Sequence, residues 1–399
     1  MNVRCFHAFV WFLAAGSAFG QSLAITGATV YPSSSSAPLR RTTVLIRGSR
    51  IEAVGEQVPV PAGVDVIRCA SCVVVAGFWN SHVHFTEPKW EGAASQPAKI
   101  LARQITEMLT HSGFTTVIDT GSVLSNTVAL RRRIETGEIP GPRILTAGMP
   151  IFPPNGVPYY VKDSVSPETL KALTPPANAG EAVAAVDADI RGGADLVKLF
   201  TGSWISREKV LPMPQAIASA AVRAAHKRGK LVFTHPSDLD GVRIAIAAGV
   251  DVFAHAPEQT RGVDGAILKS AVNQHMAMIP TLKLFGEDNN IADIRRVVRQ
   301  FDQMGGLLVF GTDTGYLTDY DVSQEYEQLA QAGLSWRDTL AMLTENPARL
   351  FGDQTNRGRV KSGMAGDLTI LEADPATDPS AFRRVRYTIR NGKVIWASR

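Results

Sequence analysis

Two histidines separated by a single residue, His82 and His84, stand at the end of an apolar run that begins at Val73. Side chains alternate between the two faces of a β-strand, so both imidazoles leave the same face and can bind one ion. The same spacing also arises by chance, or in strand histidines with ordinary hydrogen bonds. The pair makes a metal enzyme the first hypothesis, and the other ligands must come from elsewhere in the chain.

Further metal-binding side chains stand at the ends of other short apolar runs. They are Lys198, His235, His255 and Asp313, in this order along the chain. Each has an ordinary explanation when taken alone, because a lysine can extend to solvent and an aspartate beside glycine is common in turns. Their joint placement is hard to produce by accident. It predicts that all of them share one site with the histidine pair.

Lys198 is the most informative of these residues. It interrupts the apolar run 196–200, where an unpaired ammonium is costly to bury. A salt bridge, or a stem that reaches solvent, would explain it. The alternative is that the amine, deprotonated near a metal, adds carbon dioxide and becomes a carbamate whose two oxygens bridge two cations. Asp313 can likewise be a turn residue, or it can bind an ion and carry a proton from water to the leaving group.

These side chains need a scaffold that gathers several strand ends. Short apolar strands alternate with helical stretches through the middle of the chain, the pattern that closes into a parallel barrel with helices outside. The active sites of such barrels lie at the carboxyl ends of the strands, where the candidate residues stand. We predict eight strands, at 73–85, 115–121, 144–148, 196–202, 231–236, 252–256, 278–282 and 308–315.

Both ends of the chain are strand-like and rich in turns, and Asn391-Gly392 is a strong hairpin-turn signal. We expect them to form one small sheet domain together. The proline-rich segment 150–178 is long for a connection, so we expect a loop or lid near the barrel mouth. Tyr159 and Tyr160 in this segment, with Trp204 after the fourth strand, are candidate substrate-binding residues.

The first twenty residues read as a signal peptide, with Arg4, an apolar stretch and the small-residue pattern Ala18-Phe-Gly20. We expect a periplasmic or secreted protein, cleaved near Gly20. The apolar stretch is shorter than the ~20 residues that span a bilayer, so stable membrane insertion is not expected. Cys69 and Cys72 could form a local disulfide in an oxidising compartment, whereas two thiols alone make a poor zinc site.

Composition narrows the function further. The formal charge of +4 over 399 residues is spread without a block of basic residues, so nothing favours a nucleic acid as partner. We expect a small-molecule substrate. The sequence leaves no readable mark of oligomeric state.

Several separated motifs resemble the amidohydrolase superfamily, in its imidazolonepropionase-like and prolidase-like branch, over nearly the whole mature chain. The matching segments are GFWNSHVH at 77–84, ADLVK at 194–198, TH at 234–235, AAGVDVFAH at 247–255, GTD at 311–313, TENPARL at 344–350 and GMAGDL at 363–368.

The resemblance implies an α/β fold, a distorted TIM (β/α)8 barrel with a small β-sandwich built from both termini. The expected domains are a signal peptide at 1–20, the sandwich at 21–72 and 353–399, and the hydrolase barrel at 73–352. His82, His84 and Asp313 would hold one metal and His235 and His255 a second, with carboxylated Lys198 bridging them. Two Zn²⁺ ions are expected, and manganese, cobalt or iron would also suit these ligands.

Two positions depart from the family pattern. Many relatives carry an aspartate two residues before the first histidine, where this chain has Asn80. Many prolidase-type relatives carry a further histidine after His235, where this chain reads Pro236-Ser237-Asp238, so prolidase specificity is not carried over. Asp238 also resembles the acidic residue of single-metal deaminase-like members, although capping a helix is its more ordinary role.

The leading hypothesis is an exported metal-dependent amidohydrolase that cleaves an amide bond in a dipeptide, an N-acyl amino acid or a cyclic amide. A hydroxide between the two metals would attack, and Asp313 would carry the proton. One alternative is a single-metal hydrolase or deaminase with unmodified Lys198 and help from Asp238. A lactonase or esterase is another. A non-catalytic binding protein is less favoured, because every expected ligand position holds a competent residue.

Overall fold

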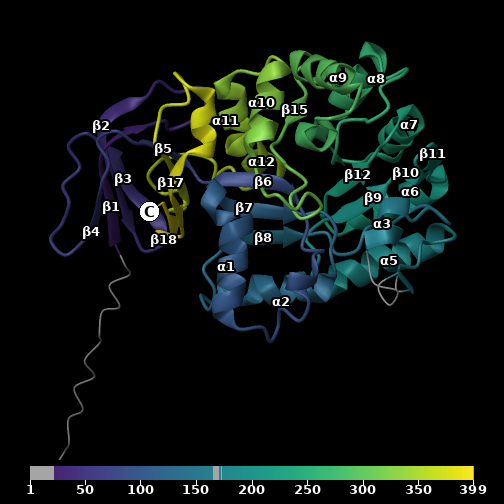
Figure 1. The fold of residues 1–399 in the computed structure, drawn as a ribbon, viewed down its shortest axis with the longest axis horizontal. Coiled ribbons are helices and arrows are strands. Elements are labelled where there is room, and N and C mark those ends of the chain that lie inside the picture. The colour runs from purple at the N-terminus through teal and green to yellow at the C-terminus, as the bar shows by residue number, and fades with distance from the viewer. Residues whose placement is uncertain (1–21, 165–169, 172, 399) are drawn as a thin grey trace, which may run out of the picture.

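The protein is described here by a computed structural model covering residues 22–164, 170–171 and 173–398. The predicted signal peptide and its cleavage point lie outside the described residues, as does part of the segment 150–178. Two bodies lie side by side in Figure 1: a sheet formed by the two chain ends, in purple and yellow, and a larger body formed by the middle of the chain.

The larger body contains eight parallel strands in two sheets. The first sheet has the order β6-β7-β8, and the second has the order β15-β14-β13-β12-β9. Parallel bridges join the sheets at both seams, from Val83 to Thr314 and from Ile151 to Leu199. The ring therefore closes as predicted. Its strands are β6 (Phe78–Val83), β7 (Phe114–Asp119), β8 (Arg143–Thr146), β9 (Val197–Phe200), β12 (Val232–His235), β13 (Val252–Phe253), β14 (Ala277–Met278) and β15 (Leu307–Leu308).

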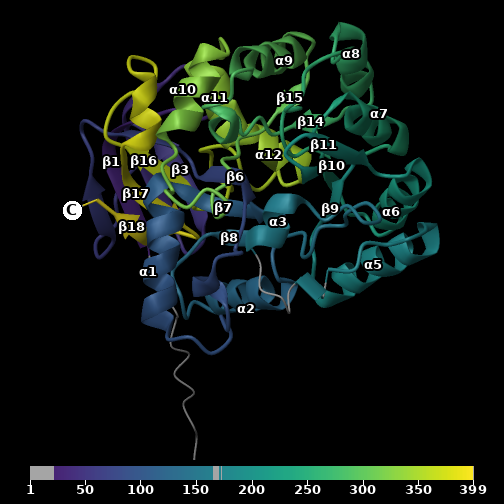
Figure 2. The same ribbon diagram turned by 45° about the vertical axis from the view of Figure 1, so that its right-hand side comes forward.

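The helices lie around these strands, as Figure 2 shows. Helix α9 illustrates the packing, since Ile294, Val297, Val298 and Phe301 form one buried stripe at helical spacing. None of the helices in the described ranges is long and apolar enough to cross a membrane. The helices are α1 (Ala98–Met108), α2 (Leu124–Glu135), α3 (Tyr159–Ser164), α5 (Ala179–Gly192), α6 (Gln215–Lys227), α7 (Leu239–Ala248), α8 (Gly265–Asn273), α9 (Ile291–Gln303), α10 (Ser323–Gln331), α11 (Trp336–Leu343) and α12 (Glu345–Leu350).

The two chain ends share one sheet, in the order β18-β17-β16-β5-β1-β2-β3, with β4 paired to β1. The predicted hairpin joins β17 to β18, and Asn391 and Gly392 both have positive φ, as a tight hairpin turn requires. The strands are β1 (Ser22–Val30), β2 (Leu39–Arg47), β3 (Arg50–Gly55), β4 (Asp65–Arg68), β5 (Val73–Ala76), β16 (Leu368–Leu371), β17 (Val385–Arg390) and β18 (Lys393–Ala397).

One predicted strand was wrong. Residues 73–85 do not form a single barrel strand, because β5 pairs with β1 and β16 in the terminal sheet while β6 pairs with β7 in the barrel. Gly77 stands between them, where a Cβ atom would lie 2.3 Å from Oγ1 of Thr115. Both strands are buried along their whole length, so the apolar run shows no break at the junction.

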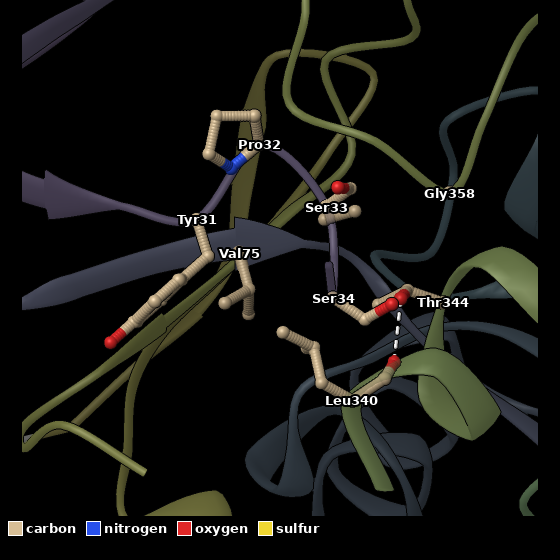
Figure 3. Close-up of a pocket in the computed structure, with 9 residues that line it drawn as sticks. Tyr31, Pro32, Ser33, Ser34, Val75, Leu340, Thr344 and Gly358 are labelled. Carbon is tan, nitrogen blue, oxygen red and sulfur yellow. Dashed lines mark hydrogen bonds between the residues drawn. The ribbon is translucent and has the colours of Figure 1, made fainter. Parts of the chain in front are cut away.

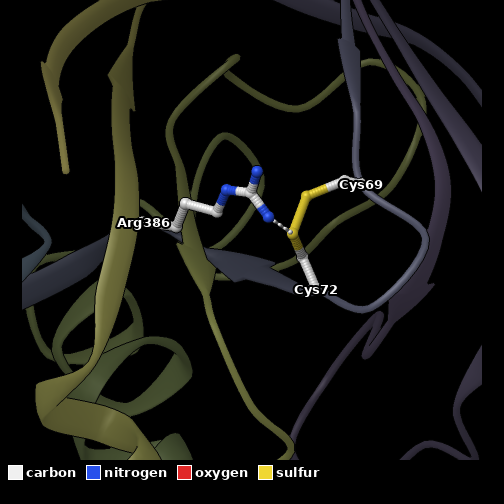
Figure 4. Close-up of a disulfide and its surroundings, with 3 residues drawn as sticks. All are labelled: Cys69, Cys72 and Arg386. Atoms are coloured by element: carbon white, nitrogen blue, oxygen red, sulfur yellow. Dashed lines mark hydrogen bonds between the residues drawn. A yellow bond between two sulfur atoms is a disulfide. The ribbon is translucent and has the colours of Figure 1, made fainter. Parts of the chain in front are cut away.

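The terminal sheet packs closely on the barrel. Figure 3 shows the crevice where Tyr31, Val75 and Leu340 meet, which leaves no room for a water molecule. Figure 4 shows the Cys69–Cys72 disulfide in the turn between β4 and β5, with Nη1 of Arg386 3.3 Å from Sγ of Cys72. The disulfide and its Arg386 contact lie within the terminal sheet, and the crevice marks where this sheet packs against the barrel.

Candidate metal centre

Three of the predicted ligands meet at the carboxyl end of the barrel. The Nε2 atoms of His82 and His84 are 3.2 Å apart and lie 3.2 Å and 3.0 Å from Oδ1 of Asp313. Donors about 2.0 Å from one tetrahedral ion are separated by about 3.3 Å, so this spacing fits a shared cation. Asp313 Oδ1 is buried and has no hydrogen-bond partner. The three residues therefore fit a metal.

The backbone fixes how these ligands point. The loop after β15 pairs with the end of β6, because Asp313 N–H donates to His82 O at 3.0 Å and His84 N–H donates to Thr314 O at 2.8 Å. Asp313 adopts φ 57°, a left-handed conformation that aspartate tolerates better than most residues. A Cβ on Gly315 would lie 1.9 Å from His84 O, so only glycine permits this close approach.

Carbonyl oxygens set the tautomers of the two histidines. Nδ1 of His82 lies 2.7 Å from Ala254 O, and Nδ1 of His84 lies 2.7 Å from Gly121 O. A carbonyl only accepts, so both Nδ1 atoms carry a proton, and in the neutral rings the Nε2 lone pairs face Asp313. This is the usual arrangement of metal-binding histidines.

His255 is prepared in the same way. Its Nδ1 lies 2.7 Å from the hydroxyl of Thr281, which itself donates to Pro280 O at 2.8 Å. The Thr281 oxygen therefore accepts from His255, which leaves the other imidazole nitrogen as an acceptor. The His255 ring lies 4.4 Å from the His82 ring and 4.5 Å from the His235 ring, between centroids. His235 in turn stacks on Phe200, at 4.8 Å and 8°.

Lys198 lies on β9, is 1% exposed, and its Nζ atom is 5.3 Å from the centre of the Phe200 ring. Over the described residues, no hydrogen bond or ion pair to its amine is found. Burial lowers the pKa of this amine to about 7, while the charge of Asp313 acts in the opposite direction. The salt bridge that would have explained Lys198 as a structural residue is absent from the described part of the chain.

Burial and mutual contacts shift the pKa values of Asp313 and the histidines. Burial lowers the pKa of His82 to about 4 and holds that of His255 well below its ordinary value. Burial also disfavours charge on His84, but the close contact with the Asp313 carboxylate outweighs it and raises the pKa. Burial would raise the pKa of Asp313, yet His82 and His84 hold it well below its usual range. The centre thus keeps an ionised carboxylate beside neutral His82 and His255.

The two departures from the family pattern have structural roles. Asn80 does not contact the imidazole rings: its amide donates to Oγ1 of Thr312 at 2.7 Å and accepts from His82 N–H at 3.2 Å, so it ties β6 to the Asp313 loop. Asp238 accepts from Gly241 N–H at 2.9 Å and caps α7. It does not line the cavity beside the centre.

A cavity of about 750 Å³ opens above the centre and reaches His84, Lys198, His235, His255 and Asp313. The predicted residues Tyr159, Tyr160 and Trp204 all line it. Tyr160 comes from α3, and Trp204 from the hairpin of β10 (Gly202–Ser206) and β11 (Lys209–Pro212). Phe152, Phe200, Phe285 and Tyr316 add further aromatic surface.

The sequence interpretation missed Glu258. This residue follows His255 in the loop after β13, and its Oε1 lies 3.0 Å from His235 Nε2 while its Oε2 accepts from the indole N–H of Trp204. The rule that selected Asp313, a carboxylate just beyond a barrel strand, would have selected it too. Arg207, in the β10–β11 turn, was also missed; it lies over the Tyr159 ring at 5.6 Å.

Comparisons with known proteins agree with this geometry. A family model described as "Amidohydrolase family" matches residues 73–395. The chain is 23% identical to a dihydroorotase of Clostridium acetobutylicum, over 88% of this chain and 94% of that protein. Among solved structures it is similar to a Xaa-Pro dipeptidase with bound methionine, at 22% identity and a TM-score of 0.80, covering 95% of this chain and 100% of that one. A putative prolidase from Bifidobacterium longum gives 25% identity and a TM-score of 0.78, covering 96% and 97%.

Proposed function

Because the chain belongs to the amidohydrolase family, and is therefore a hydrolase of carbon–nitrogen bonds, we propose that it cleaves the amide bond of a dipeptide, an N-acyl amino acid or a cyclic amide. The observation that carries this proposal is the convergence of His82, His84 and Asp313 at the floor of an aromatic cavity. In this proposal His82, His84 and Asp313 hold one divalent cation, and His235 and His255 hold a second.

The bound cations would supply Lewis acidity, which activates water and polarises the scissile carbonyl. Asp313 then accepts a proton from the attacking water and delivers it to the nitrogen as the carbon–nitrogen bond breaks. Its position supports this role, because Oδ1 is buried, free of hydrogen bonds and at the cavity floor. The aromatic walls exclude water from the substrate and strengthen these electrostatic contacts.

Lys198 becomes a carbamate in this proposal. Its neutral amine attacks carbon dioxide: a nitrogen–carbon bond forms as one carbon–oxygen π bond opens. The proton lost from nitrogen passes to solvent, which leaves an anionic carbamate with two oxygens. The buried, unpartnered amine that faces the cavity supports this step, and so does its lowered pKa, which makes the neutral amine available near pH 7. Histidine, carboxylate and carbamate ligands suit zinc, and also manganese, cobalt or iron.

The rival functions have weaker support. A single-metal deaminase that uses Asp238 is disfavoured, because that carboxylate caps α7 and does not line the cavity. Lactones and esters have a carbonyl similar to that of an amide, and only activity separates them. We also propose export to the periplasm or beyond, from the signal-peptide pattern of residues 1–20. The Cys69–Cys72 disulfide, which suits an oxidising compartment, supports it.

The proposal is tested by a hydrolysis screen on protein loaded with one defined metal at a time. The panel contains dipeptides, N-acyl amino acids, cyclic amides, esters, lactones and aminated heterocycles that a deaminase would use. We expect turnover of at least one amide class, abolished by a chelator and restored by metal. Turnover confined to esters and lactones, release of ammonia from the heterocycles alone, or no turnover of any compound would contradict the proposal.

A further inference from the structure

Glu258 is a carboxylate on the cavity wall. Its side chain is 18% exposed, and it contacts His235 and the indole of Trp204. Across the part of the chain that the structure describes, no lysine or arginine forms an ion pair with it. Removing a carboxylate from water costs free energy unless a cation pairs with it. This wall of the cavity therefore favours a positively charged group.

The surroundings of Glu258 add to this negative potential. Asp288 lines the same cavity, and burial, followed by the charge of Glu258, raises its pKa. The other charged residues that line the cavity are Glu87, Glu91, Lys198, Arg207 and Asp313. Glu87 is paired with Lys89 at 3.0 Å, and Arg207 lies over the Tyr159 ring.

Aromatic rings line the same cavity as this carboxylate. Tyr160 and Tyr316 are among its lining residues, together with Glu258 and Trp204. The Tyr160 and Tyr316 rings are in edge contact at 5.6 Å, and Trp204 holds Glu258 directly. A ring face attracts a cation, and most strongly where water is excluded. A carboxylate among aromatic rings therefore suits an ammonium group carried on an apolar stem.

Both oxygens of Glu258 already have one contact each: Oε1 lies 3.0 Å from His235 Nε2, and Oε2 accepts from the indole N–H of Trp204. A carboxylate offers about four acceptor sites, so each oxygen can accept a further hydrogen bond from a substrate.

We propose that Glu258 binds a protonated amine of the substrate, with Trp204, Tyr160 and Tyr316 around it. This rests on the proposed amide hydrolysis and narrows its substrate class to amides that carry an ammonium group, such as aminoacyl amides and dipeptides with a free amino terminus. N-acylated analogues of the same compounds lack the charge and are poor substrates.

The first test measures binding without catalysis. The probes are 2-phenylethylammonium and its neutral analogue 2-phenylethanol, titrated into metal-loaded protein near pH 7 by calorimetry. We expect the wild type to bind the ammonium probe at least about ten-fold more tightly than the alcohol, since charge-assisted hydrogen bonds are strong. Glu258→Gln keeps an acceptor for Trp204 and should remove that difference. Glu208→Gln removes an exposed charge from the β10–β11 turn and should keep it.

Three results would overturn the proposal: equal binding of the two probes to the wild type, an unchanged preference in Glu258→Gln, or loss of bound metal in that variant together with equal weakening of both probes. The last result would assign Glu258 to holding His235.

The second test compares hydrolysis of free dipeptides with that of their N-acetyl forms. We expect a higher kcat/KM for the free forms, with KM rising about ten-fold or more in Glu258→Gln for these substrates alone. Ammonium binding without any amide turnover would reject the proposed function and keep the subsite. Turnover of free and acetylated forms at equal rates would reject the subsite and keep the function.

Discussion

The residues of the centre show how hydrogen bonds prepare ligands before a cation arrives. The carbonyls of Ala254 and Gly121 and the hydroxyl of Thr281 each take one imidazole proton. The remaining nitrogens face inward as acceptors, beside a carboxylate held in its ionised form. Binding of a cation relieves the repulsion among these acceptors, so the arrangement favours a metal.

Asp313 and Asp238 have different expected roles, and matched substitutions separate them. Asp313→Asn keeps the shape of the side chain but removes the proton acceptor and a charged ligand. We expect kcat on the amide found by screening to fall by at least about 100-fold, with loss of bound metal. Asp238→Asn is the matched control, because asparagine caps a helix as well as aspartate does, and we expect activity close to the wild type. A larger loss of activity in Asp238→Asn than in Asp313→Asn would favour the single-metal deaminase hypothesis.

The sequence predicted that these side chains come together because each candidate ligand stands at or just beyond the end of a buried strand. Their role as metal ligands stays a prediction. The sequence could not show that Asn80 ties two loops together, because that contact spans residues far apart in the chain. Glu258 stands as far beyond β13 as Asp313 stands beyond β15, so the same rule could have selected it. Its contacts with His235 and Trp204 are visible only in the structure.

The elements bring these residues together through close backbone contacts. The apolar run 73–85 predicted one strand, and the structure divides it into β5 and β6 at Gly77. The division needs a residue without a side chain, which hydropathy does not register. Several predicted strands are also shorter than expected, since the residues after β13, β14 and β15 turn into the loops that carry His255, Thr281 and Asp313.

Gly77→Ala tests this junction. Its Cβ would lie 2.3 Å from Thr115 Oγ1, so β6 must move relative to β7, and we expect a loss of about 1–3 kcal/mol in the free energy of unfolding. Gly55→Ala at the end of β3 is the control, since its Cβ meets only Val58, at 3.4 Å. Urea denaturation of both variants measures the difference. Equal stability of the two variants would show that the junction tolerates a side chain.

Helix α10 carries a buried acid that makes stability depend on pH. Glu325 accepts from Lys283 N–H at 2.7 Å, and burial raises its pKa to about 8, from the 4.5 expected when unfolded. The folded state then holds a proton that the unfolded state releases. The stability that comes from this bound proton is fully present below pH 4.5 and is lost as pH rises toward 8.

Glu325→Gln should abolish that loss. As pH rises from about 5 to about 8, we expect the free energy of unfolding of the variant to increase, relative to that of the wild type, by on the order of a few kcal/mol. Denaturation curves at both pH values measure it. Glu208→Gln, which removes an exposed acid, should keep the wild-type pH dependence. An unchanged slope in Glu325→Gln would place the pH dependence elsewhere.

The disulfide and the candidate metal centre lie in different parts of the molecule. The terminal sheet contains the Cys69–Cys72 disulfide, while the proposed metal ligands His82, His84 and Asp313 lie at the carboxyl end of the barrel. A bridge across a sequence separation of 3 closes a very short loop and restricts the unfolded chain little. The fold and this division were predictable from sequence, because both chain ends read as strands and the middle alternates strand with helix.

Replacing both cysteines, Cys69→Ser with Cys72→Ser, should lower the free energy of unfolding by at most about 2 kcal/mol. Metal content and kcat should not change, because the bridge is remote from the cavity. Denaturation and metal analysis of the same preparation check both parts. A loss of metal with the bridge would show that the terminal sheet shapes the centre.

The central claim is a centre of two cations joined through Lys198, and counting metal tests it most directly. Elemental analysis of purified wild-type protein and of Lys198→Ala, each loaded with zinc, gives the number of ions per chain. We predict about two ions in the wild type and about one in the variant, together with loss of amide hydrolysis. A fully active wild-type enzyme with a single ion, or a Lys198→Ala variant that keeps both ions and its activity, would contradict it.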